Sequence, residues 1–194
     1  MAARDTDTKG RILAAARRLL RAGGPSRVTF DAVAAEVGVT KQAVIYWFPT
    51  KARLGAALVL PALEAEGAAV RDAVAGLTGA LAAEAAVRAL AAFHLADLER
   101  FRLMYLAPQM GGGRGDVVDP DIHATTARMY GALAAALDGG VGAGEAETRR
   151  RAVALHAAVV GLVTMVALAD ALDDPLKHGA ADLVEALVAQ MAGV

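Results

Sequence analysis

The sequence contains no cysteine, which excludes disulfide bonds, thiol catalysis and cysteine-ligated zinc sites together. Serine occurs only as Ser26, and aromatic residues amount to one Trp, three Tyr and four Phe in 194 residues. Few segments show the alternation of β-branched and aromatic residues that is typical of strands. Alanine, the strongest helix former, is abundant instead. The composition therefore predicts an all-α protein, and no nucleophile stands in a recognisable catalytic setting.

Long uninterrupted apolar runs are also scarce. The longest, residues 152–169, contains His156, Gly161 and Thr164 and is flanked by charge, so it predicts a buried helix rather than a membrane span of about 20 residues. Residues 1–11 are polar and carry both charge signs, unlike a signal peptide. Together with the absence of cysteine, these features predict a soluble cytoplasmic protein with no membrane partner.

Charge is distributed unevenly along the chain. Residues 1–53 hold ten Lys or Arg against four Asp or Glu, a net charge of +6, whereas residues 54–194 hold ten against seventeen, a net charge of −7. A basic N-terminal quarter on an acidic body indicates a polyanionic partner. The alternative is a charged surface that only faces solvent.

The N-terminal quarter has the pattern of a helix-turn-helix. A helix is expected over residues 8–22, followed by a short helix that Thr29 caps and Gly38 ends. Thr40 caps a second short helix only two residues later, and Thr50 a further one. Two short helices joined by a glycine turn of this length form a helix-turn-helix.

In the second short helix, Val44 and Phe48 are expected to face the core, together with Ala43 and Trp47. The outward residues suit DNA. Gln42 can pair with an adenine edge and Ile45 can touch a thymine methyl group. The side chains that suit phosphate oxygens are Thr29, Thr40, Lys41, Tyr46 and Lys51. The alternative is that Tyr46 and Trp47 are both core residues.

Residues 8–55 resemble the DNA-binding domain of TetR-type transcriptional repressors. The matching motifs are Thr29-Phe30-x-x-Val33-Ala34-x-x-x-Gly38-Val39-Thr40 and Phe48-Pro49-Thr50-Lys51-x-x-Leu54. The sequence departs from the family at Ile45-Tyr46-Trp47-Phe48, where Tyr-x-His-Phe is usual, so Tyr46 becomes a candidate for the phosphate contact usually made at the position of Ile45. The resemblance implies a DNA-binding domain over residues 1–50 and a ligand-binding and dimerisation domain over 51–194.

The helix that begins at Lys51 contains Pro61, so a kink or break is expected near Leu58 to Pro61. Residues 84–106 predict one long amphipathic helix with His94 and Asp97 on an apolar stripe. A cavity with a few placed polar groups is the usual small-molecule site. We therefore expect a cavity between the helices around 94–105 and 123–130 for a mostly apolar effector, lined by His94, Asp97, Phe101, Tyr105, His123 and Tyr130.

Two alternatives remain for these polar residues. His94 and Asp97 can reach solvent or pair with each other. His94, Asp97 and His123 can also meet to hold a divalent metal, because two histidines and one carboxylate form a known ligand set. No His-x-x-x-His pair is present, and no metal or other cofactor is predicted.

Residues 108–120 include Gly111-Gly112-Gly113-Arg114-Gly115 and predict a connection between helices. The helices expected over 144–170 and 176–191 are unusually apolar for a monomer's surface, and the resemblance assigns the last two helices to a dimer interface. The interface residues are predicted to be Val153, Ala157, Val160, Gly161, Thr164, Leu183 and Leu187. The alternative is packing within one chain.

The sequence thus predicts a ligand-responsive repressor that binds an inverted-repeat operator as a homodimer and leaves it when a small molecule binds. The alternative function is a helical small-molecule carrier or interaction module whose helix-turn-helix is only structural. Salt-sensitive, sequence-selective binding to DNA distinguishes the two.

Overall fold

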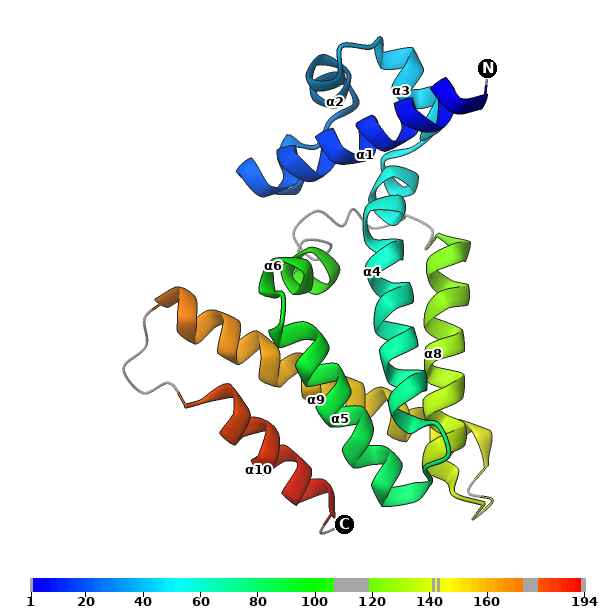
Figure 1. Cartoon of the computed structure of the whole chain (residues 1–194), viewed down its shortest axis with the longest axis vertical. Helices are drawn as coiled ribbons and strands as arrows, with labels where there is room; N and C mark the ends of the chain where they lie inside the picture. The colour runs from blue at the N-terminus through cyan, green and yellow to red at the C-terminus, as the bar shows by residue number, and fades with distance from the viewer. Residues whose placement is uncertain (1, 107–118, 141, 143, 173–177, 193–194) are drawn as a thin grey trace. The chain divides into compact units, whose positions relative to one another are not determined.

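A computed structural model describes residues 2–106, 119–140, 142, 144–172 and 178–192 (Figure 1). All regular structure in these ranges is helical, which confirms the predicted all-α class. The chain forms two compact units: unit 1 comprises Met1–Leu63 and Arg102–His123, and unit 2 comprises Glu64–Phe101 and Ala124–Val194.

Unit 1 contains α1 (Ala2–Gly23), η1 (Pro25–Arg27), α2 (Phe30–Val37), α3 (Lys41–Trp47), the start of α4 (Lys51–Val74) and the π-helical η2 (Arg102–Leu106). Helix α1 begins six residues before the predicted start at Thr8. Helix α2 packs against both α1 and α3. The buried core of this unit is apolar and consists of Ile12, Ala15, Ala16, Val33, Ala34, Val37, Val44, Phe48, Leu54 and Leu58.

Leu54 and Leu58 lie in the first turns of α4, beyond the predicted domain boundary at residues 50 and 51. Their burial with Ile12 and Val44 explains why unit 1 extends to Leu63. Helix α4 is continuous through Pro61, so the break that proline was expected to allow does not occur.

Unit 2 contains the rest of α4, then α5 (Gly79–Leu95), α6 (Leu98–Phe101), most of α8 (Pro120–Asp138), α9 (Glu145–Leu172) and α10 (Ala180–Ala192). Helix α5 packs against α9 and α10, and α10 also contacts α9. Helix α10 begins at Ala180, later than the predicted Leu176, which lies outside the described residues, as does most of the predicted connection 108–120.

The single helix predicted over 84–106 is wrong: α5 ends at Leu95 and α6 begins at Leu98. Asp97 causes the new start, because its Oδ1 accepts a hydrogen bond from the backbone N–H of Arg100 at 2.9 Å, as an N-cap does. The Arg100 guanidinium in turn donates to the carbonyl of Phe93 and stacks 4.0 Å from the Phe93 ring centroid. A capping aspartate therefore interrupts the apolar periodicity.

Helix α9 is the one helix in the described ranges that, by length and composition alone, is apolar enough to cross a membrane. An 18-residue window within Glu145–Ala169 has a mean hydropathy of 2.3. A core helix of a soluble protein satisfies the same test, and Ala152, Leu155, Val159 and Val163 are buried within unit 2.

Candidate DNA interface and buried histidine–glutamate cluster

Helix α3 is positioned by the turn that joins it to α2. Gly38 adopts φ 76°, a left-handed conformation that glycine accepts without strain, and its N–H donates to the carbonyl of Ala34 at 2.9 Å. Thr40 then caps α3, because its Oγ1 accepts from the N–H of Ala43 at 3.2 Å. The predicted helix-turn-helix is thus formed by the expected turn and cap residues.

Helix α3 divides into a buried and an exposed face. Val44 and Phe48 are buried, and Trp47 packs against the same core. Tyr46 is 75% exposed and meets the Trp47 ring edge-on, with 5.4 Å between the ring centroids. Of the two aromatic residues, only Trp47 therefore belongs to the core.

The outward residues of α3 are available to a partner. Lys41 and Gln42 are exposed, and Ile45 is half-buried. Lys41 forms a 2.9 Å ion pair with Asp31 at the start of α2. Both side chains are largely exposed, so this pair is weak and can be exchanged for a phosphate contact. Lys51, at the start of α4, is also exposed.

The hydroxyls of Thr29 and Thr40 act as acceptors within the protein. Thr29 Oγ1 accepts from the N–H of Ala32 at 3.1 Å, and Thr40 Oγ1 does the same for α3. A hydroxyl that accepts a bond keeps its own proton as a donor. Each threonine can therefore cap its helix and donate to a phosphate oxygen simultaneously.

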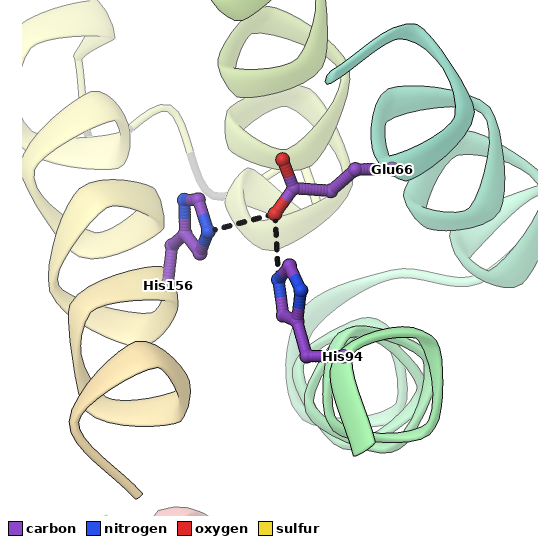
Figure 2. A group of neighbouring side chains, drawn as sticks. All are labelled: Glu66, His94 and His156. Atoms are coloured by element: carbon purple, nitrogen blue, oxygen red, sulfur yellow. Dashed lines mark hydrogen bonds and ion pairs between the residues drawn. The ribbon is translucent and has the colours of Figure 1, made fainter. Parts of the chain in front are cut away.

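Unit 2 contains a buried polar cluster that joins three helices (Figure 2). Glu66 on α4 directs Oε1 toward two imidazoles: Nε2 of His94 on α5 lies 2.9 Å away and Nε2 of His156 on α9 lies 3.1 Å away. All three residues are buried. Because a carboxylate oxygen only accepts, both Nε2 atoms carry the proton and donate in this arrangement.

Tyr130 on α8 extends the cluster. Its hydroxyl lies 2.7 Å from Nδ1 of His156, so with the proton of His156 on Nε2 the tyrosine donates to Nδ1. Burial raises the pKa of Tyr130, and the nearby negative charge of Glu66 raises it further, while Arg149 opposes the shift. Tyr130 therefore stays protonated and keeps its donor at neutral pH.

Aromatic rings hold His94 in place. The ring of Phe93 lies edge-to-face with His94 at 5.2 Å between centroids, and Phe101 does so at 5.3 Å. Phe101 is fully buried. The imidazole of His94 is thus fixed by apolar packing on its sides and by Glu66 at Nε2.

The six residues predicted to line a ligand cavity separate into two groups. His94, Phe101 and Tyr130 gather around Glu66 and His156. Asp97 is exposed and caps α6, while His123 is exposed on α8 and Tyr105 is half-buried in η2. The grouping of His94, Asp97 and His123 that was considered for a metal is therefore replaced, in the described residues, by Glu66, His94 and His156.

Glu66 and His156 were not among the predicted site residues, although the sequence carries a signal for each. Glu66 follows Leu63 by three residues and precedes Val70 by four, so it falls on the buried stripe of α4. His156 interrupts the longest apolar run of the chain. A charged or titratable residue on a buried stripe requires a partner.

A surface groove of about 420 Å³ lies beside this cluster, between α8 and the beginning of α9. Of the predicted lining residues it contains only Tyr130. Its other charged or polar lining side chains are Asp138, Glu145, Thr148 and Arg149, and Gly131, Ala134 and Ala135 contribute the apolar floor.

The predicted interface residues on α9 form a stripe of mixed exposure. Val153, Ala157 and Gly161 are exposed, and Val160 and Thr164 are half-buried. Met165, Leu168 and Leu172 continue the exposed apolar stripe, and Met165 is 64% exposed. On α10, Leu183 and Leu187 are half-buried because they lie beside the buried Val184 and Val188.

Comparison with protein families identifies both parts of the chain. Residues 12–58 match the model of bacterial regulatory proteins of the tetR family, and residues 83–191 match that of the tetracyclin repressor-like C-terminal domain. The chain belongs to the TetR family. Members of this family are DNA-binding transcriptional regulators and not enzymes. No curated protein sequence matches the chain.

Several solved structures share the fold of this TetR-family chain. The protein SCO4313 is 18% identical with a TM-score of 0.76, and the match covers 100% of this chain and 99% of SCO4313. The multidrug binding protein EbrR, solved with imidazole, is 21% identical with a TM-score of 0.59, and the match covers 94% of this chain and 93% of EbrR. PfmR from Thermus thermophilus, a TetR family transcriptional regulator, is 21% identical with a TM-score of 0.56, and the match covers 93% of this chain and 96% of PfmR.

Proposed function

We propose that this TetR-family regulator is a cytoplasmic, ligand-responsive repressor that binds an inverted-repeat operator as a homodimer and is released by a small molecule. The observation that carries the proposal is the exposed face of α3, where Lys41, Gln42 and Tyr46 project from a helix held by Thr40 and buried Val44. A recognition helix needs this combination, because its base-reading side chains must be free while its backbone is fixed.

The contacts divide into two kinds. Gln42 reads an adenine edge, and Ile45 contacts a thymine methyl group through the part of its side chain that is exposed. Thr29, Thr40, Lys41, Tyr46 and Lys51 hold phosphates and set the register of the helix without reading sequence. Residues 1–50 supply all of these contacts except that of Lys51, and residues 51–194 serve ligand binding and dimerisation.

A second copy of the chain is the proposed occupant of the apolar stripe on α9. An inverted-repeat operator requires two recognition helices related by a two-fold axis. The stripe is exposed in the single chain at Val153, Gly161 and Met165, and a Cβ placed on Gly161 meets nothing within 4 Å. A glycine at that point lets a partner helix approach closely. Helix α10 contributes Leu183 and Leu187 at the edge of the same interface.

A small molecule is proposed to act through unit 2. The groove beside Tyr130 has the size of a small-ligand site, which is about 300–1,000 Å³, and it combines alanine side chains with a few polar groups. EbrR, with the same fold, is a multidrug binding protein, which supports a small-molecule effector here. Because ligand and DNA are linked through one protein, each weakens the binding of the other by the same factor.

DNA recognition is tested by substituting one residue of each kind. Gln42→Ala is expected to relax preference at one operator position by about 1–3 kcal/mol. Lys51→Ala is expected to weaken binding to all DNA sequences alike. It should also reduce, by about one, the slope of the log binding constant against the log salt concentration. Binding to randomised sites, measured by gel shift and sequencing at several salt concentrations, separates the two effects. An unchanged sequence profile for Gln42→Ala would remove its base-reading role, and unselective wild-type binding would favour the carrier function.

Dimerisation is tested at Gly161. Gly161→Arg places a long charged side chain in the proposed helix contact, where burying an unpaired charge is costly, so sedimentation should show monomer. Gly10→Arg is the matched control, because Gly10 is an exposed helical glycine of α1 with equal space around it. It should leave the dimer intact. A wild-type protein that sediments as a monomer at micromolar concentration would contradict this part of the proposal.

A further inference from the structure

The buried cluster in unit 2 brings together two kinds of metal-ligand atom. One carboxylate oxygen of Glu66 and one imidazole nitrogen each of His94 and His156 lie within 4.8 Å of one another. They come from three different helices, α4, α5 and α9, and converge on one point (Figure 2). Two histidines and one carboxylate bind divalent transition metals in many proteins. We propose that these three residues form a site for one divalent transition-metal ion of the Zn²⁺ class.

The spacing of the ligand atoms fits this ion. In a tetrahedral site with metal–ligand bonds of about 2.0–2.1 Å, neighbouring ligand atoms are roughly 3.3 Å apart. Oε1 of Glu66 is 2.9 Å from Nε2 of His94 and 3.1 Å from Nε2 of His156. The two oxygen–nitrogen pairs therefore need to lengthen by only a few tenths of an ångström. The second carboxylate oxygen or a water completes the coordination.

The identity of the ligands selects the class of metal. Imidazole nitrogen suits Zn²⁺, Co²⁺, Ni²⁺ and Fe²⁺, whereas Mg²⁺ and Ca²⁺ prefer oxygen ligands. The absence of cysteine removes the thiolates that favour Cu⁺. Burial of all three residues also disfavours Mg²⁺, which keeps several waters. Zn²⁺ is therefore the appropriate test ion, and Co²⁺ its spectroscopic substitute.

Metal binding redirects a hydrogen bond of the cluster. An imidazole that binds a metal through Nε2 carries its remaining proton on Nδ1. Nδ1–H of His156 then donates to the Tyr130 hydroxyl, 2.7 Å away, instead of accepting from it. Such a partner on the second nitrogen is typical of metal-bound histidines. The hydroxyl proton of Tyr130 stays on its oxygen and turns toward the groove that the same side chain lines.

Tyr130 and the aromatic rings orient the ligands in advance. Tyr130 fixes the His156 ring, while Phe93 and Phe101 pack edge-on against His94. Preorientation of this kind strengthens metal binding because less side-chain freedom is lost. The site is a property of unit 2 by itself and stands whether or not the groove takes an organic effector.

The experiment uses the full-length protein, free of affinity tags and treated with a chelator that is then removed. Calorimetric titration with Zn²⁺ is expected to show one equivalent per chain and a matching rise in Tm, because a ligand that binds only the folded state stabilises it. Co²⁺ should give the visible absorption of a nitrogen- and oxygen-ligated ion. A wild-type protein that binds no stoichiometric Zn²⁺ overturns the proposal. This outcome does not depend on whether any variant folds.

Substitutions then locate the site. Glu66→Gln and His156→Gln keep polar side chains of similar size and should abolish the stoichiometric Zn²⁺ binding and the Co²⁺ spectrum. Tyr130→Phe should weaken binding by about 10–100-fold, as loss of a histidine's outer partner does. His178→Gln is the matched control, because His178 is exposed outside the cluster, and it should bind as the wild type does. Full binding in folded Glu66→Gln and His156→Gln, or its loss in His178→Gln, places the metal elsewhere and overturns the assignment.

Discussion

The interiors of the two units differ in chemistry. The core of unit 1 is apolar, and its polar groups lie at the helix ends, where Thr29, Thr40 and Thr50 cap α2, α3 and α4. Unit 2 instead buries Glu66, His94 and His156 among its packed helices. An apolar core fixes a helix at low cost, whereas a buried polar cluster is expensive unless each group is satisfied. The difference matches the proposals that unit 1 acts through the surface of α3 and that the interior of unit 2 holds a metal site.

The largest expected effect comes from the apolar core of unit 1. Phe48→Ala removes a ring that is 3% exposed and should lower the free energy of unfolding of this unit by about 3–5 kcal/mol, the usual cost of such a cavity. Urea unfolding at fixed protein concentration measures it. Tyr46→Ala, in the same helix but largely exposed, should change stability little while weakening DNA binding. Equal destabilisation by both would mean that Tyr46 packs in the core.

A smaller effect is expected at the caps. Thr40→Ala removes the acceptor for the Ala43 N–H and should cost about 1 kcal/mol of stability. It should also weaken DNA binding beyond that loss, because the same hydroxyl is proposed to reach a phosphate. Thr50→Ala removes an equivalent cap from α4 and serves as the stability control. Identical DNA affinity for the two variants would leave Thr40 with a capping role only.

The polar interior of unit 2 is tested by Tyr130→Phe in metal-free protein. This change deletes the hydrogen bond to His156 and keeps the ring, so it should cost about 0.5–1.5 kcal/mol. Thermal unfolding monitored by circular dichroism provides the measurement. A variant as stable as the wild type would show that the Tyr130–His156 bond does not stabilise the cluster.

The smallest effect is expected where unit 2 is polar on its surface. Arg88 on α5 binds both Glu84 and Glu185, and the Arg88 hydrogen bond lowers the pKa of Glu185. A lowered folded-state pKa means that the stabilisation is present above the unfolded pKa and disappears as the pH falls through the folded value. Arg88→Ala should therefore lower Tm slightly at neutral pH and not at strongly acidic pH, with the neutral-pH difference shrinking in high salt. A shift of Tm that is independent of pH would attribute the effect to packing.

The helix caps and the glycine turn of unit 1 were predictable because each depends on only a few neighbouring residues. Thr29, Gly38 and Thr40 have the positions of a cap, a left-handed turn and a second cap, and the structure places them so. Spacing also placed Tyr46 on the outward face of the second short helix, and the structure confirms this, with its side chain 75% exposed. The helix start at Asp97 was not predictable, because an aspartate inside a helical pattern can also begin a new helix, and only its bond to Arg100 decides.

The sequence by itself determined the helical class and the helix-turn-helix, because alanine content, capping residues and apolar periodicity act locally. The motifs over residues 29–40 and 48–54 carried the resemblance to the TetR family. The sequence also marked His94 as a residue to explain. Only the tertiary structure decided which groups His94 meets. Glu66 lies 28 positions before it and His156 lies 62 after it, and no local rule relates positions so far apart. Their meeting depends on how α4, α5 and α9 pack, which is set by the complementary shapes of their buried side chains.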